Sequence, residues 1–282
     1  MSDALTALAI AANWALYIGS LGASGTVFCA AVFGIAGTRK LAAMFAFVAL
    51  VAASVSFSLK GAALTGDVAG MWDGEMLSLL WQTSSGTMIK LQLAGLALLF
   101  AGLVMGDAGR FVCVIGGFMV LLAFAMIGHV ADRGNWLVAA VLVLHLVAAA
   151  FWFGILFPLY RLAGDPNRLS DAAALGARFG QSAILAVPVL LLAGVVMTYV
   201  LLGSVPAITG TAYGRVLLVK IVVVGILLSL GAANKLRFVP SMQRKELGGA
   251  VRLRRSIAIE WVCFAAVTGC TAILTATLSP PL

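Results

Sequence analysis

Long apolar runs separated by short polar breaks make up most of this chain of 282 residues. A helix needs about 20 apolar residues to cross the hydrocarbon core of a bilayer, and each run is roughly that long or longer. Because lipid offers the backbone no hydrogen-bond partners, such runs must be helical, and the alternation typical of membrane-spanning strands is absent. The pattern predicts an all-α, polytopic membrane protein with eight transmembrane helices, approximately at 8–35, 41–63, 87–106, 110–131, 136–161, 178–203, 213–237 and 254–278.

Basic residues in the polar breaks predict the orientation of these helices. Lys and Arg are frequent in the odd-numbered breaks, which are 37–40, 106–110, 161–171 and 235–255, and sparse in the even-numbered ones. Cytoplasmic loops of membrane proteins carry this excess. We therefore expect the odd loops in the cytoplasm and the N and C termini on the outer side, which in a bacterium is the periplasm. No internal repeat is visible, so residues 1–282 are expected to form a single integral membrane domain.

Composition narrows the range of functions. Only 10% of the residues are charged, against about 25% in an ordinary soluble domain. The net charge of +8 follows from the basic loops, so we expect the lipid bilayer and not nucleic acid as the partner of this surface. The sequence contains no phosphate-binding loop, no HExxH and no GxSxG. We therefore predict that the protein is not an enzyme and that this chain alone does not pump by ATP hydrolysis.

The longest outward segment is residues 64–86, which includes MWDGEMLSLLW. This pattern predicts a short helix at the membrane interface, with Trp72 and Trp81 as anchors. Met71 and Met76 belong to the same segment, where they are either interfacial anchors or copper ligands.

Four cysteines occur in or beside apolar runs, where a disulfide framework is not expected. They fit small buried residues, and soft ligands along a metal path are the alternative. The four are Cys29, Cys113, Cys263 and Cys270.

Both histidines of the chain fall in one predicted hairpin. His129 lies near the outer end of the fourth span and His145 lies about 13 Å below the start of the fifth. Ionisable side chains at such depth usually mark a functional site. Met126 precedes His129 by three residues and shares its helix face. Trp152 follows His145 by seven residues, which places both on one face of the fifth span. The depths of the two imidazoles differ by about 5–10 Å, which favours two stations over one shared metal ion.

Imidazole and thioether ligands together suit copper, and cuprous ion in particular. A neutral imidazole at pH 7 can bind a metal without first losing a proton. We therefore predict that His129, His145 and Met126 bind copper at successive positions along a path. Hydrogen-bonded structural histidines are an alternative, as is a b-type haem for electron transfer. A third possibility, from another class, is a membrane assembly factor that docks partners without any metal.

Two charged residues are also predicted inside the membrane. Lys220 lies about two turns into the seventh span from the outer face, and Glu260 about two turns into the eighth from the inner face. This difference in depth argues against a direct ion pair. Lys220 is expected to snorkel outward. Glu260 is expected to meet Asn234, Lys235 or Arg237, or to carry a proton or a cation near the cytoplasmic exit.

Several short motifs occur in an order that resembles the copper resistance protein D family (CopD/PcoD). They include GHV at 128–130, HLVAAAFWFGILFPL at 145–159, AYGRVLLVK at 212–220 and LRRSIAIE at 253–260. The resemblance implies an inner-membrane protein of eight spans that transports copper together with a periplasmic copper-binding protein such as CopC. The positions that match the family motifs, and so belong to the implied transport path, are His129, His145, Trp152, Lys220 and Glu260.

Overall fold

A computed structural model of the protein describes residues 3–106, 108–127, 135–204, 206–246 and 248–280. The described residues form helices and no strand, and eight helical segments are long and apolar enough to cross a membrane, as predicted. These segments are α1 (Asp3–Phe33), α2 (Arg39–Thr65), α4 (Ser84–Val104), α5 (Gly109–Leu122) with η2 (Ala123–Met126), α7 (Trp136–Leu162), η3 (Pro166–Arg168) with α8 (Leu169–Leu202), α10 (Ala212–Ala233) with η4 (Asn234–Phe238) and α11 (Val239–Gln243), and α12 (Gly249–Ala276).

Several helices extend beyond the predicted spans. The first begins at Asp3 and not at residue 8, the sixth segment begins at Pro166 and not at 178, and the seventh continues to Gln243. Hydropathy marks only the apolar part of a helix, whereas the backbone hydrogen bonds continue into polar sequence outside the hydrocarbon. The predicted spans are therefore the apolar parts of longer helices.

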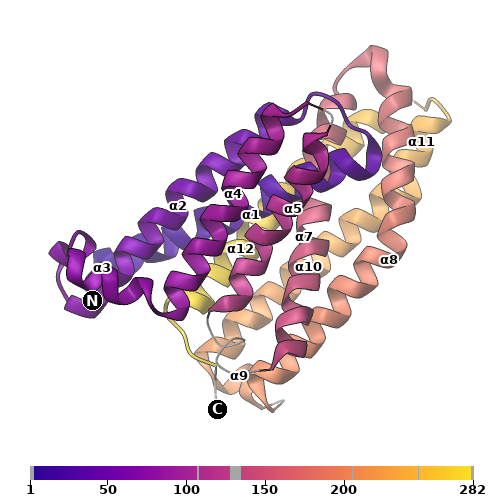
Figure 1. Cartoon of the computed structure of the whole chain (residues 1–282). Coiled ribbons are helices and arrows are strands. Elements are labelled where there is room, and N and C mark those ends of the chain that lie inside the picture. Colours follow the sequence, from indigo (N-terminus) through magenta and orange to yellow (C-terminus); the bar gives the residue numbers. More distant parts are fainter. Residues whose placement is uncertain (1–2, 107, 128–134, 205, 247, 281–282) are drawn as a thin grey trace.

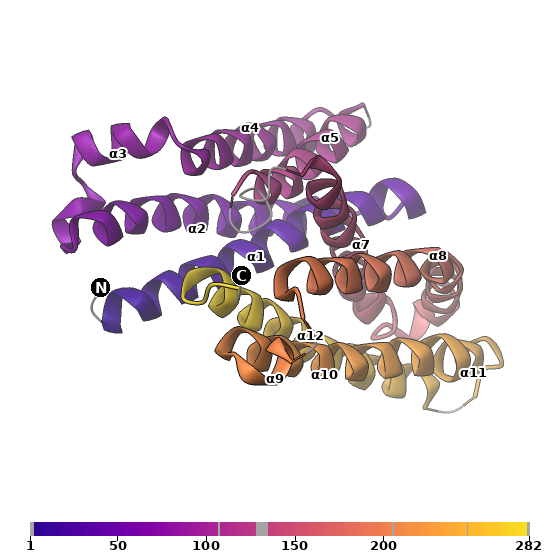
Figure 2. The same ribbon diagram turned by 90° about the horizontal axis from the view of Figure 1, so that it is seen from below.

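Helix α1 lies at the centre of the bundle, where it contacts α2, α5, α7 and α12 (Figure 2). Its glycines let the neighbouring helices approach closely, as small residues do in membrane proteins. A Cβ atom on Gly19 would lie 2.6 Å from the backbone nitrogen of Ala49 in α2. A Cβ atom on Gly25 would overlap the carbonyl oxygen of Ala150 in α7. The small residues of GSLGASG thus position α7, which carries several of the candidate site residues.

Replacing Gly25 with alanine is expected to destabilise the protein by about 1–3 kcal/mol, because the added methyl group has no space between α1 and α7. Thermal unfolding in detergent would measure the loss. Gly225→Ala is the matched control, since a Cβ atom there meets open space in α10. Equal unfolding temperatures for the two variants would contradict this account of the packing.

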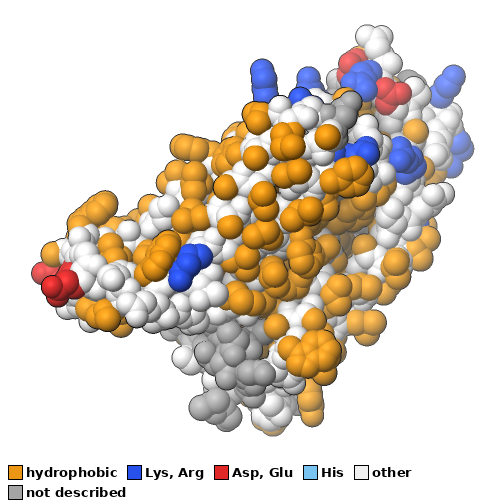
Figure 3. Space-filling view, viewed as in Figure 1, with side chains coloured by type: hydrophobic (Ala, Val, Ile, Leu, Met, Phe, Trp, Pro, Cys, Tyr) orange, Lys and Arg blue, Asp and Glu red, His pale blue; other side chains and the backbone are white. Residues whose placement is uncertain are grey.

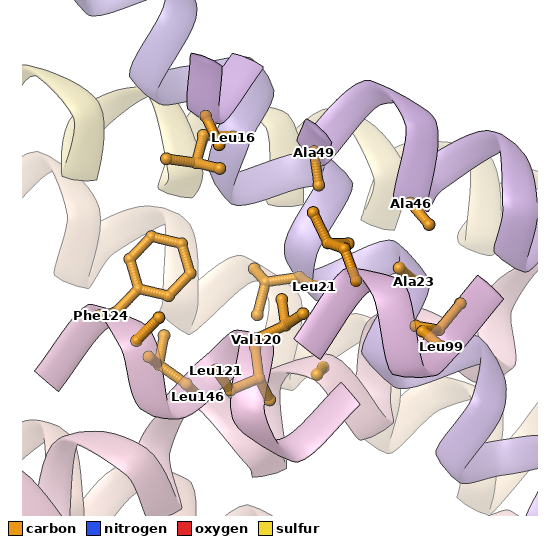
Figure 4. Packing of buried hydrophobic residues seen from close by; sticks show 14 of the residues in the cluster. Leu16, Leu21, Ala23, Ala46, Ala49, Leu99, Val120, Leu121, Phe124 and Leu146 are labelled. Atoms are coloured by element: carbon orange, nitrogen blue, oxygen red, sulfur yellow. The ribbon is translucent and has the colours of Figure 1, made fainter. Parts of the chain in front are cut away.

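Two buried apolar clusters support the bundle. The first joins α1, α2, α4, α5 and α7 (Figure 4), and it includes Leu21, Leu99, Val120 and Leu146. The second joins α7, α8 and α12 around Trp152, and it includes Ile155, Ile257 and Phe264. Trp152 belongs to this second cluster, and Glu260 lies beside it.

The two ends of the bundle differ in charge. The N-terminus, α3 (Gly74–Trp81), α9 (Ala207–Gly210) and the C-terminus lie toward one end (Figure 1). Most Lys and Arg side chains seen in Figure 3 gather at the other end, near α11. This is the charge distribution on which the predicted orientation depends, and the orientation itself remains a prediction.

Residues 64–86 contain the predicted short helix, α3, and Trp72 lies just before it. A 3-10 turn, η1 (Val68–Met71), precedes α3, and the Asp73 side chain caps α3 by accepting hydrogen bonds from the backbone of Glu75 and Met76. Trp72 and Trp81 are exposed, as interfacial anchors should be. Met71 packs against a small apolar cluster that contains Leu5 and Leu59, so its side chain serves packing.

Candidate functional site

A carboxylate is buried at the centre of the second cluster. The side chain of Glu260 in α12 is 1% exposed. The indole Nε1 of Trp152 in α7 donates a hydrogen bond to its Oε2 at 2.8 Å, and the amide Nδ2 of Asn234 donates to its Oε1 at 2.5 Å. Three segments that are far apart in sequence therefore meet at one carboxyl group. The prediction that Glu260 meets Asn234 is confirmed, whereas its contact with Trp152 was not predicted.

Asn234 begins a π-helical segment, η4, between α10 and α11. Pro240 follows two residues after this segment and has no N–H to donate to the carbonyl four residues earlier. In the π turn just before this proline, the backbone hydrogen bonds shift locally from the α-helical to the π-helical pattern. Such turns often occur at functional sites. Here the turn begins at Asn234, the residue that bonds Glu260, while the side-chain oxygen of Asn234 is buried without a hydrogen-bond partner among the described residues.

The indole ring of Trp152 packs against residues of α10 and α12. A Cβ atom on Gly231 in α10 would lie 2.8 Å from Cζ2 of the indole, so the glycine leaves the space that the ring occupies. Phe264 in α12 contacts the same ring edge-to-face at 6.1 Å between centroids. The indole N–H is therefore fixed toward Glu260, and a shift of α10 or α12 would disturb this hydrogen bond.

His145 lies two turns before Trp152 on α7 and makes a polar contact of its own. Its Nδ1 atom lies 3.1 Å from the backbone carbonyl oxygen of Leu190 in α8. A carbonyl can only accept, so Nδ1 carries the proton in this contact. In the neutral imidazole, Nε2 then keeps its lone pair and can bind a metal ion.

A second nitrogen base lies near His145. Lys220 in α10 is half-buried and lies within electrostatic range of His145 and of Cys270 in α12. No ion pair joins Lys220 to a carboxylate in the part of the chain that the structure describes, and none joins it to Glu260.

Among the other predicted ligands, the structure describes Met126 alone. Met126 ends η2, is half-buried and packs against the first apolar cluster. His129 lies outside the described residues. Within the described ranges, no group of three or more His, Cys, Asp or Glu side chains is arranged to hold one metal ion. The predicted set of His129, His145 and Met126 stays a prediction.

All four cysteines are free thiols, as the sequence predicts. Cys29 in α1 is buried and donates a hydrogen bond to the carbonyl oxygen of Phe151 at 3.2 Å, next to Trp152. Cys113 donates to the carbonyl oxygen of Leu99 at 3.5 Å. These two thiols fit the role of small buried residues in helix contacts.

The eight apolar helices define a multi-pass helical membrane protein, and comparison with known proteins identifies its family. A family model described as copper resistance protein D-like, N-terminal domain, matches residues 1–138. The model of copper resistance protein D matches residues 172–274. The chain belongs to the copper resistance protein D family.

Three curated relatives are similar to the chain. Copper transport protein CutJ of Bacillus subtilis is 32% identical over 168 residues, which are 58% of this chain and 30% of CutJ. Inner membrane protein YebZ of Escherichia coli is 33% identical over 49% of this chain and 47% of YebZ. Copper resistance protein D of Pseudomonas syringae pv. tomato is 28% identical over 86% of this chain and 84% of that protein. The chain thus spans less than half the length of the first two relatives. No solved structure matches it.

Proposed function

We propose that this protein handles copper at the bacterial inner membrane and conducts it inward from the periplasmic face. Copper arrives near His129 and Met126, passes His145 and leaves toward the basic end of the bundle. The observation that carries the proposal is the match of both parts of the chain to copper resistance family models. The names of two relatives specify copper transport or resistance. These names do not favour the alternatives of a b-type haem protein or of an assembly factor that binds no metal.

The bond from His145 to Leu190 supports His145 as the inner copper station. It orients the imidazole and leaves Nε2 as the ligand atom, which is how protein contacts commonly prepare a metal-binding histidine. Imidazole suits cuprous ion better than it suits hard cations such as Mg²⁺. A single imidazole binds weakly, and weak binding allows an ion to leave as well as to enter.

Glu260 has a different proposed role. Its carboxylate oxygens and the unpartnered oxygen of Asn234 are hard donors, which suit a proton better than cuprous ion. Buried carboxyl groups within membranes often carry protons or balance the charge of a passing cation. We assign Glu260 to this role, with Trp152 and Asn234 as the residues that position it.

The donor of the metal is proposed to be a periplasmic copper-binding protein of the CopC type. It would dock at the end of the bundle that carries α3. Since the sequence contains no phosphate-binding loop, a concentration gradient or a cytoplasmic copper-binding sink would drive the flux.

The experiment that tests this function measures copper in cells. Expression of the protein in a strain that lacks it is expected to raise cell-associated copper, measured by elemental analysis at equal external copper. His129→Ala is expected to abolish the increase, because the first station is lost. An equal copper content with and without the protein would reject the proposal.

Lys220→Met is expected to strengthen the binding of cuprous ion at His145 several-fold, because it removes a positive charge that repels the metal. An anaerobic titration of the purified protein with a competing cuprous chelator would measure the affinity. Lys90→Met is the control, since Lys90 lies on α4 over the ring of Trp81. A weaker affinity in Lys220→Met would show instead that the lysine supports the site.

A further inference from the structure

A pocket of about 430 Å³ with a mixed polar and apolar lining lies between the end of α7, η3 and the start of α12. Its volume falls within the range of small-molecule sites. Three of its lining residues are arginines, namely Arg161, Arg168 and Arg254, and the lining contains one carboxylate, Asp165. The pocket lies in the loop region where α7 and α12 emerge from the apolar part of the bundle. It contains none of the residues proposed to conduct copper.

Arg254 is held in a fixed position within this pocket. Its guanidinium lies over the ring of Tyr160, with Cζ 4.3 Å from the ring centroid. A Cβ atom on Gly164 would lie 3.2 Å from the same Cζ, so the glycine leaves the guanidinium its space. The Nε of Arg254 is nevertheless buried without a hydrogen-bond partner among the described residues. The terminal nitrogens of the same guanidinium form no hydrogen bond or ion pair among the described residues, so they can donate to an anion in the pocket.

The nearby carboxylates do not neutralise this cluster. Asp171 pairs with Arg168 through Nε at 3.0 Å on the exposed surface. Asp165 uses its Oδ1 to accept a hydrogen bond from the backbone of Asn167. No ion pair involves Arg161 or Arg254 among the described residues. The lining therefore keeps a positive excess with unused donors.

We propose that this pocket binds a phosphate group, and that the ligand is the phosphodiester headgroup of an anionic membrane lipid. The planar guanidinium fork matches phosphate oxygens in pairs. Phe157 and Leu162 add apolar surface to the same lining, which suits the glycerol and acyl part of a lipid. Anionic lipids attract basic residues at the membrane surface, and basic pockets between transmembrane helices bind their headgroups.

Binding to the purified, detergent-solubilised full chain tests the proposal. Native mass spectrometry would compare phosphatidylglycerol, phosphatidylcholine and inorganic phosphate as probes. We expect a preference for phosphatidylglycerol that falls about tenfold in Arg254→Gln and in Arg161→Gln, since each removes a charged donor. Arg255→Gln is the matched control, because Arg255 is the exposed neighbour of Arg254 and does not line the pocket.

The variants and probes separate the possible outcomes. Arginine-dependent binding of phosphatidylglycerol supports the lipid as the ligand. Binding of inorganic phosphate with the same dependence and no lipid preference supports the phosphate site with a soluble anion as its source. If Arg254→Gln does not fold, Arg161→Gln decides the question. Equal binding of the two lipids without phosphate binding, or an equal loss in Arg255→Gln, would overturn the proposal.

Discussion

Replacing His145 with alanine is expected to abolish the copper uptake that expression of the protein supports. His145 supplies the proposed inner station, and its Nδ1 bond to Leu190 leaves Nε2 as the ligand atom. Without the imidazole, a desolvated cuprous ion would meet mainly apolar side chains at this depth, and such an environment strongly disfavours a charge. Elemental analysis of cells that express equal amounts of wild-type and variant protein would measure the effect.

Gly194→Ala is the matched control for this prediction. A Cβ atom at Gly194 in α8 would lie 3.6 Å from Cε1 of His145, which is ordinary van der Waals contact. The variant therefore changes the surroundings of the imidazole but keeps the ligand, and uptake should be close to that of the wild type. Normal uptake in His145→Ala, with the protein present in the membrane, would rule out His145 as a copper station.

Replacing Glu260 with leucine is expected to destabilise the protein by about 3 kcal/mol, because two donors lose their acceptor. The indole N–H of Trp152 and the amide of Asn234 would remain at a buried position without an acceptor. Thermal unfolding in detergent would show the loss. Glu246→Gln is the control, since Glu246 pairs with Arg244 on an exposed loop.

Glu260→Gln separates a structural role from a functional one. Glutamine keeps the shape and one acceptor oxygen, so it should retain more of the stability than leucine does. It cannot carry a charge or release a proton. If Glu260 only holds helices together, Glu260→Gln should transport copper normally. We expect instead that copper uptake is reduced in both variants.

The eight spans could be predicted because each is a long apolar run, and a bilayer allows such a run only one structure. Their arrangement could not be predicted in the same way. The central place of α1 depends on which helices Gly19 and Gly25 contact, and small residues indicate close packing without naming the partner. The polar helix ends, such as the start of the sixth segment at Pro166, carried too little hydropathy signal to be assigned.

The candidate site could be predicted in part. Ionisable residues inside apolar sequence were enough to single out Glu260 and His145. Their contacts depend on how each helix is oriented about its own axis in the bundle, which the sequence does not specify. Trp152 and Glu260 are 108 residues apart, and no local pattern joins them. The partner of His145 is a backbone carbonyl, which every residue has, so the sequence contains no signal for Leu190. The π turn at Asn234 is a change in backbone hydrogen bonding that has no sequence motif of its own, so it could not be predicted.

The most direct test of copper binding inside the membrane is the metal content of the purified protein. Wild-type protein and the double variant His129→Ala/His145→Ala would be loaded with cuprous ion without oxygen, freed of excess metal and analysed for copper per chain. We predict that the wild type retains copper and that the double variant retains none above a control membrane protein. Equal copper in the two proteins would contradict the proposal that these histidines bind the metal.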